Sequence, residues 1–72
     1  MKKGVLNYSV VYIENDERKE EIFITKLSAI NNYIGLLYSH KNISSLTVYE
    51  IYKKPGKNPE NITGKINNFL NN

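Results

Sequence analysis

Hydrophobic and polar residues alternate over residues 5–13, with the period of two that is typical of a β-strand. The even-numbered face is the more continuously apolar, so we expect it to meet the core. Val11 and Ile13 on the odd-numbered face leave this choice open, because a slip of one residue exchanges the two faces of a strand. The expected core face carries Leu6, Tyr8, Val10 and Tyr12.

A tight turn and a returning strand follow this segment. Asn15 and Asp16 suit the turn, since their short polar side chains tolerate turn conformations. β-branched and aromatic residues then dominate residues 21–27, which predicts the second arm of an antiparallel hairpin. Five acids outnumber two cations at the tip of this hairpin, and we expect the tip to be exposed to solvent. The acids are Glu14, Asp16, Glu17, Glu20 and Glu21.

A helix is predicted from residue 28 to the region of residue 41, because apolar residues recur there at spacings of three and four. Ser28 is expected to cap its first turn by accepting a backbone hydrogen bond. Asn42 is expected to end the helix in the left-handed conformation. The apolar stripe consists of Ile30, Tyr33, Ile34 and Leu37.

Alternation returns over residues 46–53 and predicts a third strand, which Pro55 and Gly56 end. The pattern leaves the partner of this strand open. Placed beside the first strand after a helical crossover, the third strand would run parallel to it.

A second helix is predicted over residues 58–70. Its start carries a capping side chain, a proline at the first helical position and an acid that suits the helix dipole, in the order Asn58, Pro59, Glu60. Its apolar face consists of Ile62, Ile66, Phe69 and Leu70.

The resulting order of strand, strand, helix, strand, helix (ββαβα) predicts an α+β fold, in which a three-stranded β-sheet carries two helices. We expect residues 1–72 to form a single small domain, with a ββαβ core over 1–54 and the C-terminal helix over 58–70. A chain of this length buries only about 60% of the surface that it exposes when unfolded. A large enclosed substrate pocket is therefore not expected.

Cysteine is absent and His40 is the single histidine among 72 residues, which excludes disulfides, thiol chemistry and cysteine zinc sites. We therefore expect neither a metal nor a cofactor. The apolar runs fall far short of the roughly 20 residues that cross a membrane, and the first residues do not resemble a secretory signal. A cytoplasmic protein with no membrane partner is the expectation.

The reactive side chains form no pattern that favours catalysis, and we expect a non-enzymatic protein. Ser39 and His40 are neighbours on a predicted helix, which points their side chains roughly 100° apart. The four glycines are too dispersed for a phosphate-binding loop. Glu50 has two alternative interpretations: a buried carboxylate that needs a partner, or an edge position with the carboxylate in water.

Six tyrosines against two phenylalanines are the most suggestive feature for binding, because tyrosine joins a large apolar ring to a polar tip. Tyr49 is expected to lie with Val11, Ile13 and Ile51 in an apolar patch on the sheet face opposite the first helix, which is a binding surface unless the second helix covers it. The candidate site for a protein partner combines two tyrosines with the acidic hairpin tip: Glu14, Asp16, Glu17, Glu20, Tyr49 and Tyr52.

The net charge of +3 divides into −3 over residues 14–21 and +6 elsewhere. This division leaves an alternative function open, in which lysines bind the phosphates of a nucleic acid while Tyr49 or Tyr52 stacks on its bases. The lysines concerned are Lys53, Lys54, Lys57 and Lys65. A homodimer that pairs edge strands is a further alternative, because a three-stranded sheet exposes its edges.

The hairpin over Tyr8–Leu27, the helix after it and the tyrosine-containing strand over Val48–Ile51 resemble a layout found in small proteins of phages and mobile elements from AT-rich bacteria. The abundance of asparagine, isoleucine and lysine agrees with such a genome. The resemblance implies a small non-enzymatic protein that binds and inhibits a host or defence protein, as anti-CRISPR proteins do. It assigns no functional residue.

Overall fold

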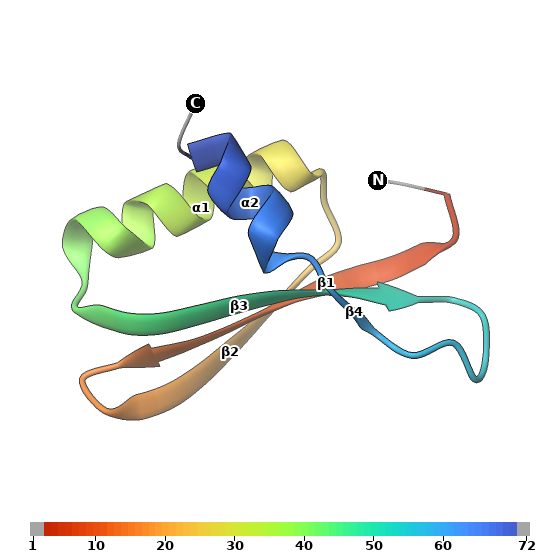
Figure 1. The fold of residues 1–72 in the computed structure, drawn as a ribbon, viewed down its shortest axis with the longest axis horizontal. Coiled ribbons are helices and arrows are strands. Elements are labelled where there is room, and N and C mark those ends of the chain that lie inside the picture. Colours follow the sequence, from red (N-terminus) through yellow and green to blue (C-terminus); the bar gives the residue numbers. More distant parts are fainter. Residues whose placement is uncertain (1–2, 71–72) are drawn as a thin grey trace.

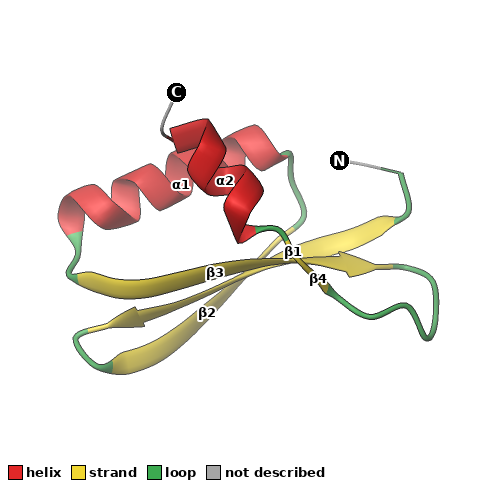
Figure 2. Ribbon diagram, in the orientation of Figure 1, coloured by secondary structure: helices red, strands yellow, loops and turns green. Residues whose placement is uncertain are grey.

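The computed structural model describes the backbone of residues 3–70 and the side chains of residues 3–66. A four-stranded sheet with the order β2-β1-β3-β4 forms one layer, and both helices cover the same face of it (Figures 1 and 2). The elements are β1 (Val5–Glu14), β2 (Glu17–Phe23), α1 (Leu27–His40), β3 (Ile43–Tyr52), β4 (Glu60–Asn61) and α2 (Thr63–Leu70).

The predicted three-stranded ββαβα arrangement is wrong, because the described chain holds a fourth, two-residue strand between β3 and α2. Glu60 and Asn61 pair antiparallel with Glu50 and Tyr49 of β3. Residues expected near the start of the second helix instead pair with the free edge of β3. Their backbone groups and those of the edge strand satisfy each other by this pairing. All neighbouring strands of the sheet run antiparallel.

The start of α2 is therefore shifted to Thr63. The amide of Ile62 donates to the carbonyl of Val48 at 2.9 Å, and the amide of Val48 donates to the Thr63 hydroxyl at 2.8 Å. The Thr63 amide donates to the side-chain oxygen of Asn61 at 3.0 Å, so Asn61 takes the capping role that was expected of Asn58. Tertiary pairing with β3 has overridden the local start signal.

The expected core face of β1 is confirmed at Tyr8, Val10 and Tyr12, which are buried. It is wrong at Leu6, which is 48% exposed, whereas Val5 is 1% exposed. The pairing of β1 with β3 shifts register between residues 5 and 7. One extra residue in a strand reverses the alternation of its side chains beyond that point, which turns Val5 inward.

The tight turn is confirmed, with φ of 51° at Asn15 and 66° at Asp16. β2 begins immediately after it, at Glu17, and ends at Phe23, earlier than the arm predicted over residues 21–27. Two left-handed residues return the chain at once, so charged residues pair with β1 as an exposed edge strand.

The apolar stripe of α1 is confirmed by three buried residues, Ile30, Ile34 and Leu37. The caps differ from the prediction. Lys26 occupies the N-cap position without a side-chain hydrogen bond, and Ser28 lies inside the helix, because Leu27 already packs against the core. Lys41 ends the helix in an extended conformation, and its amide donates a hydrogen bond to the carbonyl of residue 37 at 2.9 Å. Asn42 does not adopt the left-handed conformation that was expected of it.

β3 lies beside β1 but runs antiparallel to it, so the parallel arrangement considered for this position is wrong. The crossover helix α1 starts from β2, which already runs opposite to β1. A crossover that preserves the direction of β2 must therefore deliver β3 antiparallel to β1.

The core lies between the inner sheet face and the two helices. Phe23 at the end of β2 packs against Tyr33 of α1, with ring centroids 4.9 Å apart. Phe69 and Leu70, also expected in the core, have side chains outside the described ones. The buried apolar residues are Val5, Tyr8, Val10, Tyr12, Ile30, Ile34, Leu37, Val48, Ile62 and Ile66.

Candidate functional site

The sheet face turned away from the helices holds a shallow hollow of about 420 Å³. Three members of the predicted patch line it and are half-buried: Val11, Tyr49 and Ile51. Both described helices lie on the other side of the sheet and leave this side uncovered (Figure 1). Ile13 is half-buried too but does not line the hollow. The remaining lining residues are Asn7, Ser9, Arg18, Glu20, Ile22 and Pro59. We call the lining residues together the open face.

β2 brings charge and an exposed apolar side chain to the open face. Its even-numbered residues Arg18, Glu20 and Ile22 point to this side, and Ile22 is 54% exposed. The buried Ser9 hydroxyl of β1 donates to the Glu20 carboxylate at 2.6 Å. This hydrogen bond fixes the Glu20 carboxylate, one acid of the predicted site, against Ser9 of β1, which is the residue paired with Tyr49 of β3.

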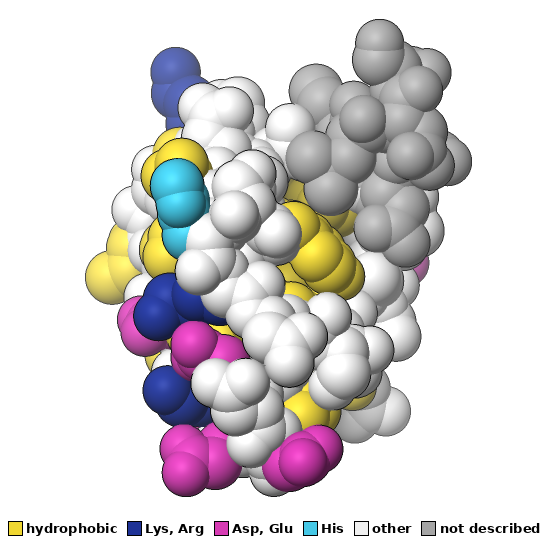
Figure 3. Space-filling model, turned by 90° about the vertical axis from the view of Figure 1, so that its left-hand side faces the viewer, with side chains coloured by type: hydrophobic (Ala, Val, Ile, Leu, Met, Phe, Trp, Pro, Cys, Tyr) yellow, Lys and Arg dark blue, Asp and Glu magenta, His cyan; other side chains and the backbone are white. Residues whose placement is uncertain are grey.

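The acidic hairpin tip is largely exposed, as expected. Figure 3 views the end of the molecule that lies on the left in Figure 1, and acidic side chains gather there beside lysine or arginine side chains. Glu14 is the exception among the acids. It pairs with Lys19 at 3.1 Å and Lys41 at 3.4 Å, and the hydrogen bond from Lys19 is the main cause that lowers the pKa of the Glu14 carboxyl.

Tyr49 and Tyr52, expected to act in one site, lie on opposite faces of the sheet, since their positions differ by an odd number along β3. Tyr52 belongs to the helix-covered side. Its hydroxyl lies 2.7 Å from a carboxylate oxygen of Glu50 and 2.7 Å from one of Glu60. These carboxylates raise the pKa of Tyr52, the Glu50 hydrogen bond being the largest cause. The structure thus separates the two tyrosines of the predicted site.

Glu50 is 2% exposed, which agrees with the buried alternative for this carboxylate and contradicts the water-exposed one. The hydroxyl groups of two tyrosines interact with this carboxylate. Tyr52 contributes the hydroxyl contact described above, and Tyr8 hydrogen-bonds to Glu50 as well, although burial is the largest cause of its raised pKa. Hydroxyl donors lower the cost of burying a carboxylate, so Glu50 acts as a polar anchor at the end of the core.

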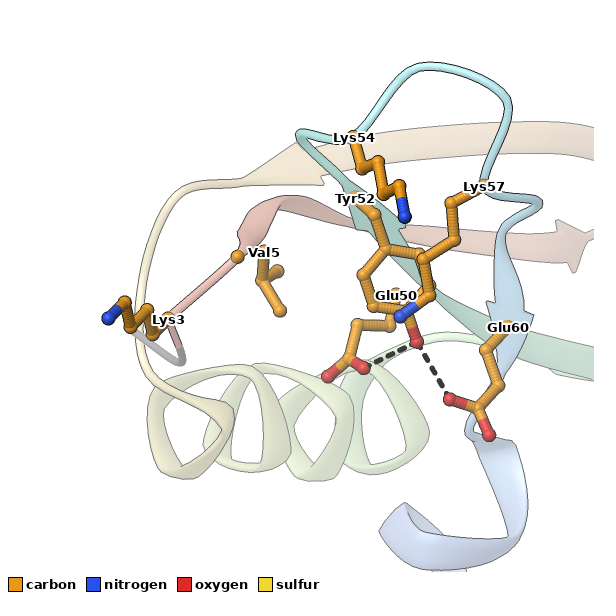
Figure 4. A pocket seen from close by; sticks show the side chains of 8 residues that line it. Lys3, Val5, Glu50, Tyr52, Lys54, Lys57 and Glu60 are labelled. Carbon is orange, nitrogen blue, oxygen red and sulfur yellow. Dashed lines mark hydrogen bonds between the residues drawn. The ribbon is translucent and has the colours of Figure 1, made fainter.

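The predicted lysine cluster is only partly brought together. Lys54 and Lys57 extend over a pocket of about 360 Å³ beside Tyr52 (Figure 4). The Lys57 ammonium nitrogen lies 3.9 Å from the centre of the Tyr52 ring. Lys53 and Lys65 are exposed but do not line this pocket. Because Lys57 covers the ring and two carboxylates hold the hydroxyl, Tyr52 is not presented for base stacking.

Sequence reasoning missed Arg18, Ser9 and Ile22 as parts of the open face. The signal for them was present but weak. Once the turn at residues 15–16 is placed, the even-numbered residues of β2 share a face with Tyr49, but the sequence pattern predicts a returning strand only from residue 21 and leaves residues 17–20 in the hairpin tip. Of the predicted partner-binding residues, Tyr49 and Glu20 lie on the open face.

Within residues 3–70, no three His, Asp or Glu side chains gather as a metal site would require. None of the helices in this range is long and apolar enough to cross a membrane. No protein-family model, curated protein or solved structure matches this chain.

Proposed function

We propose that this chain is a non-enzymatic binding protein that holds a protein partner against the open face and acts by blocking the covered surface of that partner. The observation that carries the proposal is the placement of both helices on one side of the sheet, with Tyr49 and Ile22 left accessible on the other. An apolar centre with a tyrosine and a charged rim has the anatomy of a protein interface.

The resemblance of the sequence to small phage proteins makes a host or defence protein the proposed partner. Blocking requires only a stable surface and no reactive group. A four-stranded sheet braced by helices supplies such a surface, because the strands keep Tyr49, Val11 and Ile51 in fixed register.

Affinity capture with matched pairs of variants tests the proposal. Tyr49→Ala and Ile22→Lys alter the open face, whereas Tyr38→Ala and Leu36→Lys make the same changes at exposed positions of α1. We expect a partner retained by the unaltered chain to be lost from the first pair and kept by the second. Equal capture by all four variants, each shown to be folded by circular dichroism, contradicts a role of the open face.

The nucleic-acid alternative uses Lys54 and Lys57, whose ammonium groups extend over the same pocket (Figure 4). It predicts binding of a fluorescent single-stranded oligonucleotide that weakens steeply with salt. It also predicts that Lys54→Gln reduces the salt dependence. Absence of binding at low ionic strength removes this alternative, and does so independently of the capture experiment.

A further inference from the structure

β2 is an outer strand of the sheet, and no described element lies along its free edge (Figure 1). The hairpin geometry determines which backbone groups point there. A two-residue turn makes Glu14 and Glu17 a hydrogen-bonded pair, and bonded pairs alternate with non-bonded pairs in an antiparallel ladder. Residues 17, 19, 21 and 23 therefore bond to β1, while Arg18, Glu20 and Ile22 direct their amides and carbonyls away from it.

The other side of the sheet gives the same assignment. Val48 directs both backbone groups toward β4, since its carbonyl accepts from Ile62 and its amide donates to Thr63. Tyr49 must then bond to Ser9 in β1, so the even-numbered residues of β1 face β2. They pair with residues 19, 21 and 23. Three residues at the free edge thus offer six backbone groups that no residue of the described chain pairs.

A second copy of β2 is a poor occupant of this edge. Antiparallel pairing must match edge-facing residues with edge-facing residues, so the two-fold axis passes through one residue that faces its own copy. In the registers that pair five or more residues of β2, that residue is Lys19, Glu20 or Glu21. Like charges directly opposite destabilise a strand pair, so each of these registers has a repulsive pair at its axis. Of the three, the register centred on Glu20 also places Lys19 opposite Glu21, but Lys19 is already paired with Glu14.

The charges on the edge favour a basic partner. Glu17 and Glu21 are exposed, lie on the helix side of β2 and take part in no ion pair among the described residues, whereas Lys19 between them is already paired with Glu14. In an added strand, residues opposite Glu17 and Glu21 occupy non-hydrogen-bonded sites, where side chains approach most closely. Lysine or arginine four residues apart would meet both acids.

We propose that the free edge of β2 binds an extended basic segment of a partner protein as an added antiparallel strand, with two cations opposite Glu17 and Glu21 and an apolar residue opposite Ile22. This proposal deepens the proposed function, on which it rests, by naming the chemistry of the partner. Backbone hydrogen bonds at Arg18, Glu20 and Ile22 supply the pairing, and the acids supply the selectivity.

The probe is the blocked peptide Val-Ile-Lys-Thr-Thr-Thr-Lys, whose lysines fall opposite Glu21 and Glu17. The matched control carries glutamate in place of both lysines. At low ionic strength we expect the basic peptide to bind about tenfold more tightly than the acidic one. It should slow hydrogen exchange at the amides of Arg18, Glu20 and Ile22. The chain variant E17K/E21K should reverse the preference between the peptides.

N-methylation of the peptide separates strand addition from simple charge attraction. A methyl group on the residue opposite Glu20 blocks an edge hydrogen bond and should abolish binding. The same group on the residue opposite Lys19 points away from the edge and should leave binding unchanged. Equal binding of both methylated peptides, equal binding of the acidic peptide, or no protection at the three amides with millimolar basic peptide overturns the proposal.

Tyr49→Ala distinguishes this failure from that of the proposed function. Tyr49 lies two strands away from the edge, so its variant should bind the basic peptide as the unaltered chain does. If Tyr49→Ala loses the captured partner but the basic peptide binds to no form of the chain, the result contradicts the edge proposal and leaves the open-face proposal standing. If the basic peptide binds and Tyr49→Ala still captures the partner, the result contradicts the open-face proposal and leaves the edge proposal standing.

Discussion

At the scale of single residues, polar contacts inside this small core are concentrated on Glu50. A buried carboxylate is costly unless donors surround it, and Tyr8 and Tyr52 both provide hydroxyl groups. Tyr52 also reaches Glu60 at the start of β4. The Tyr52 hydroxyl therefore links the end of the core to the short fourth strand. Composition alone would instead assign Tyr52 to partner binding.

Removing this hydroxyl should destabilise the fold. We expect Tyr52→Phe to lower the midpoint of urea unfolding, because Glu50 loses a donor while it stays buried. Tyr38→Phe is the matched control, since Tyr38 is exposed on α1 and makes no hydrogen bond among the described residues. Identical midpoints for the two variants would contradict the anchoring role of Tyr52.

The same contacts set the stability at alkaline pH. The unfolded tyrosine loses its proton near pH 10, whereas the folded Tyr52 holds its proton to higher pH because neighbouring carboxylates disfavour the phenolate. Deprotonation therefore favours the unfolded chain as pH rises above 10. We expect the melting temperature to fall over this range and to fall less steeply in Tyr52→Phe, as thermal melts at a series of pH values would measure.

At the scale of elements, the helix ends and the hairpin respond differently to local sequence. The turn at Asn15 and Asp16 forms as its residues indicate, because both residue types tolerate the left-handed backbone that they adopt here. Hydrogen bonds between Asn15 and Asn42 add a distant contact to it. The helix starts do not follow their local signals. Ser28 lies one residue inside α1, and residues 60 and 61 pair with β3 before α2 begins at Thr63.

The observed helix starts predict that Asn61→Ala destabilises the fold more than Ser28→Ala does. The sequence alone, which places a cap at Ser28 and none at Asn61, predicts the reverse order. Asn61→Ala should cost about 1 kcal/mol of unfolding free energy, because the Thr63 amide loses its capping oxygen. Ser28→Ala should change it by less than about 0.5 kcal/mol, since Ser28 caps nothing. Urea denaturation of both variants measures the difference. A larger cost for Ser28→Ala would refute the observed helix start.

Thr63 offers a second test at the same junction. Its hydroxyl accepts from the Val48 amide, so Thr63→Val should leave that amide without its partner and cost about 1–3 kcal/mol. Thr25→Val is the control, because Thr25 is also half-buried and makes no side-chain hydrogen bond among the described residues. Faster hydrogen exchange at Val48 in the first variant alone would identify the lost bond.

At the scale of the whole molecule, one ion-pair cluster joins segments that are distant along the chain. Glu14 at the end of β1 contacts Lys19 in β2 and Lys41 just after α1. Its carboxyl pKa is lowered in the folded state, so the stabilisation is present above the ordinary value of 4.5 and is lost as pH falls through the lowered folded value.

Glu14→Gln should therefore flatten the decline of melting temperature on the acid side. The decline of the unaltered chain should also shrink in 1 M salt, because Lys19 and Lys41 are exposed to solvent and salt screens their attraction to Glu14. Asp16→Asn, at the exposed turn and outside this cluster, is the control. A Glu14→Gln profile that overlays that of the unaltered chain from neutral pH down to pH 4.5, where the stabilisation should be present, would show that the cluster contributes nothing measurable.

The predictable parts of the fold were those fixed by neighbouring residues. The periods of two and of three to four located β1, α1 and β3, and the turn residues located the hairpin. The candidate site was predictable only in part. Tyr49 and its apolar neighbours follow from alternation along β1 and β3, and the same alternation puts Tyr52 on the other face. Alternation does not show that Glu60 contacts the Tyr52 hydroxyl, because Glu60 is expected in a helix and reaches this hydroxyl from β4.

The amino-acid sequence by itself determined the elements that local preferences specify: alternating strands, an amphipathic helix and a left-handed turn. Only the tertiary structure decided the fourth strand, the direction of β3, the inward turn of Val5 and the contact between Tyr52 and Glu60. The physical reason is the same in each case. Backbone groups at a strand edge and carboxylates inside a core take whichever partners the assembled sheet brings near, and those partners are not neighbours in the chain.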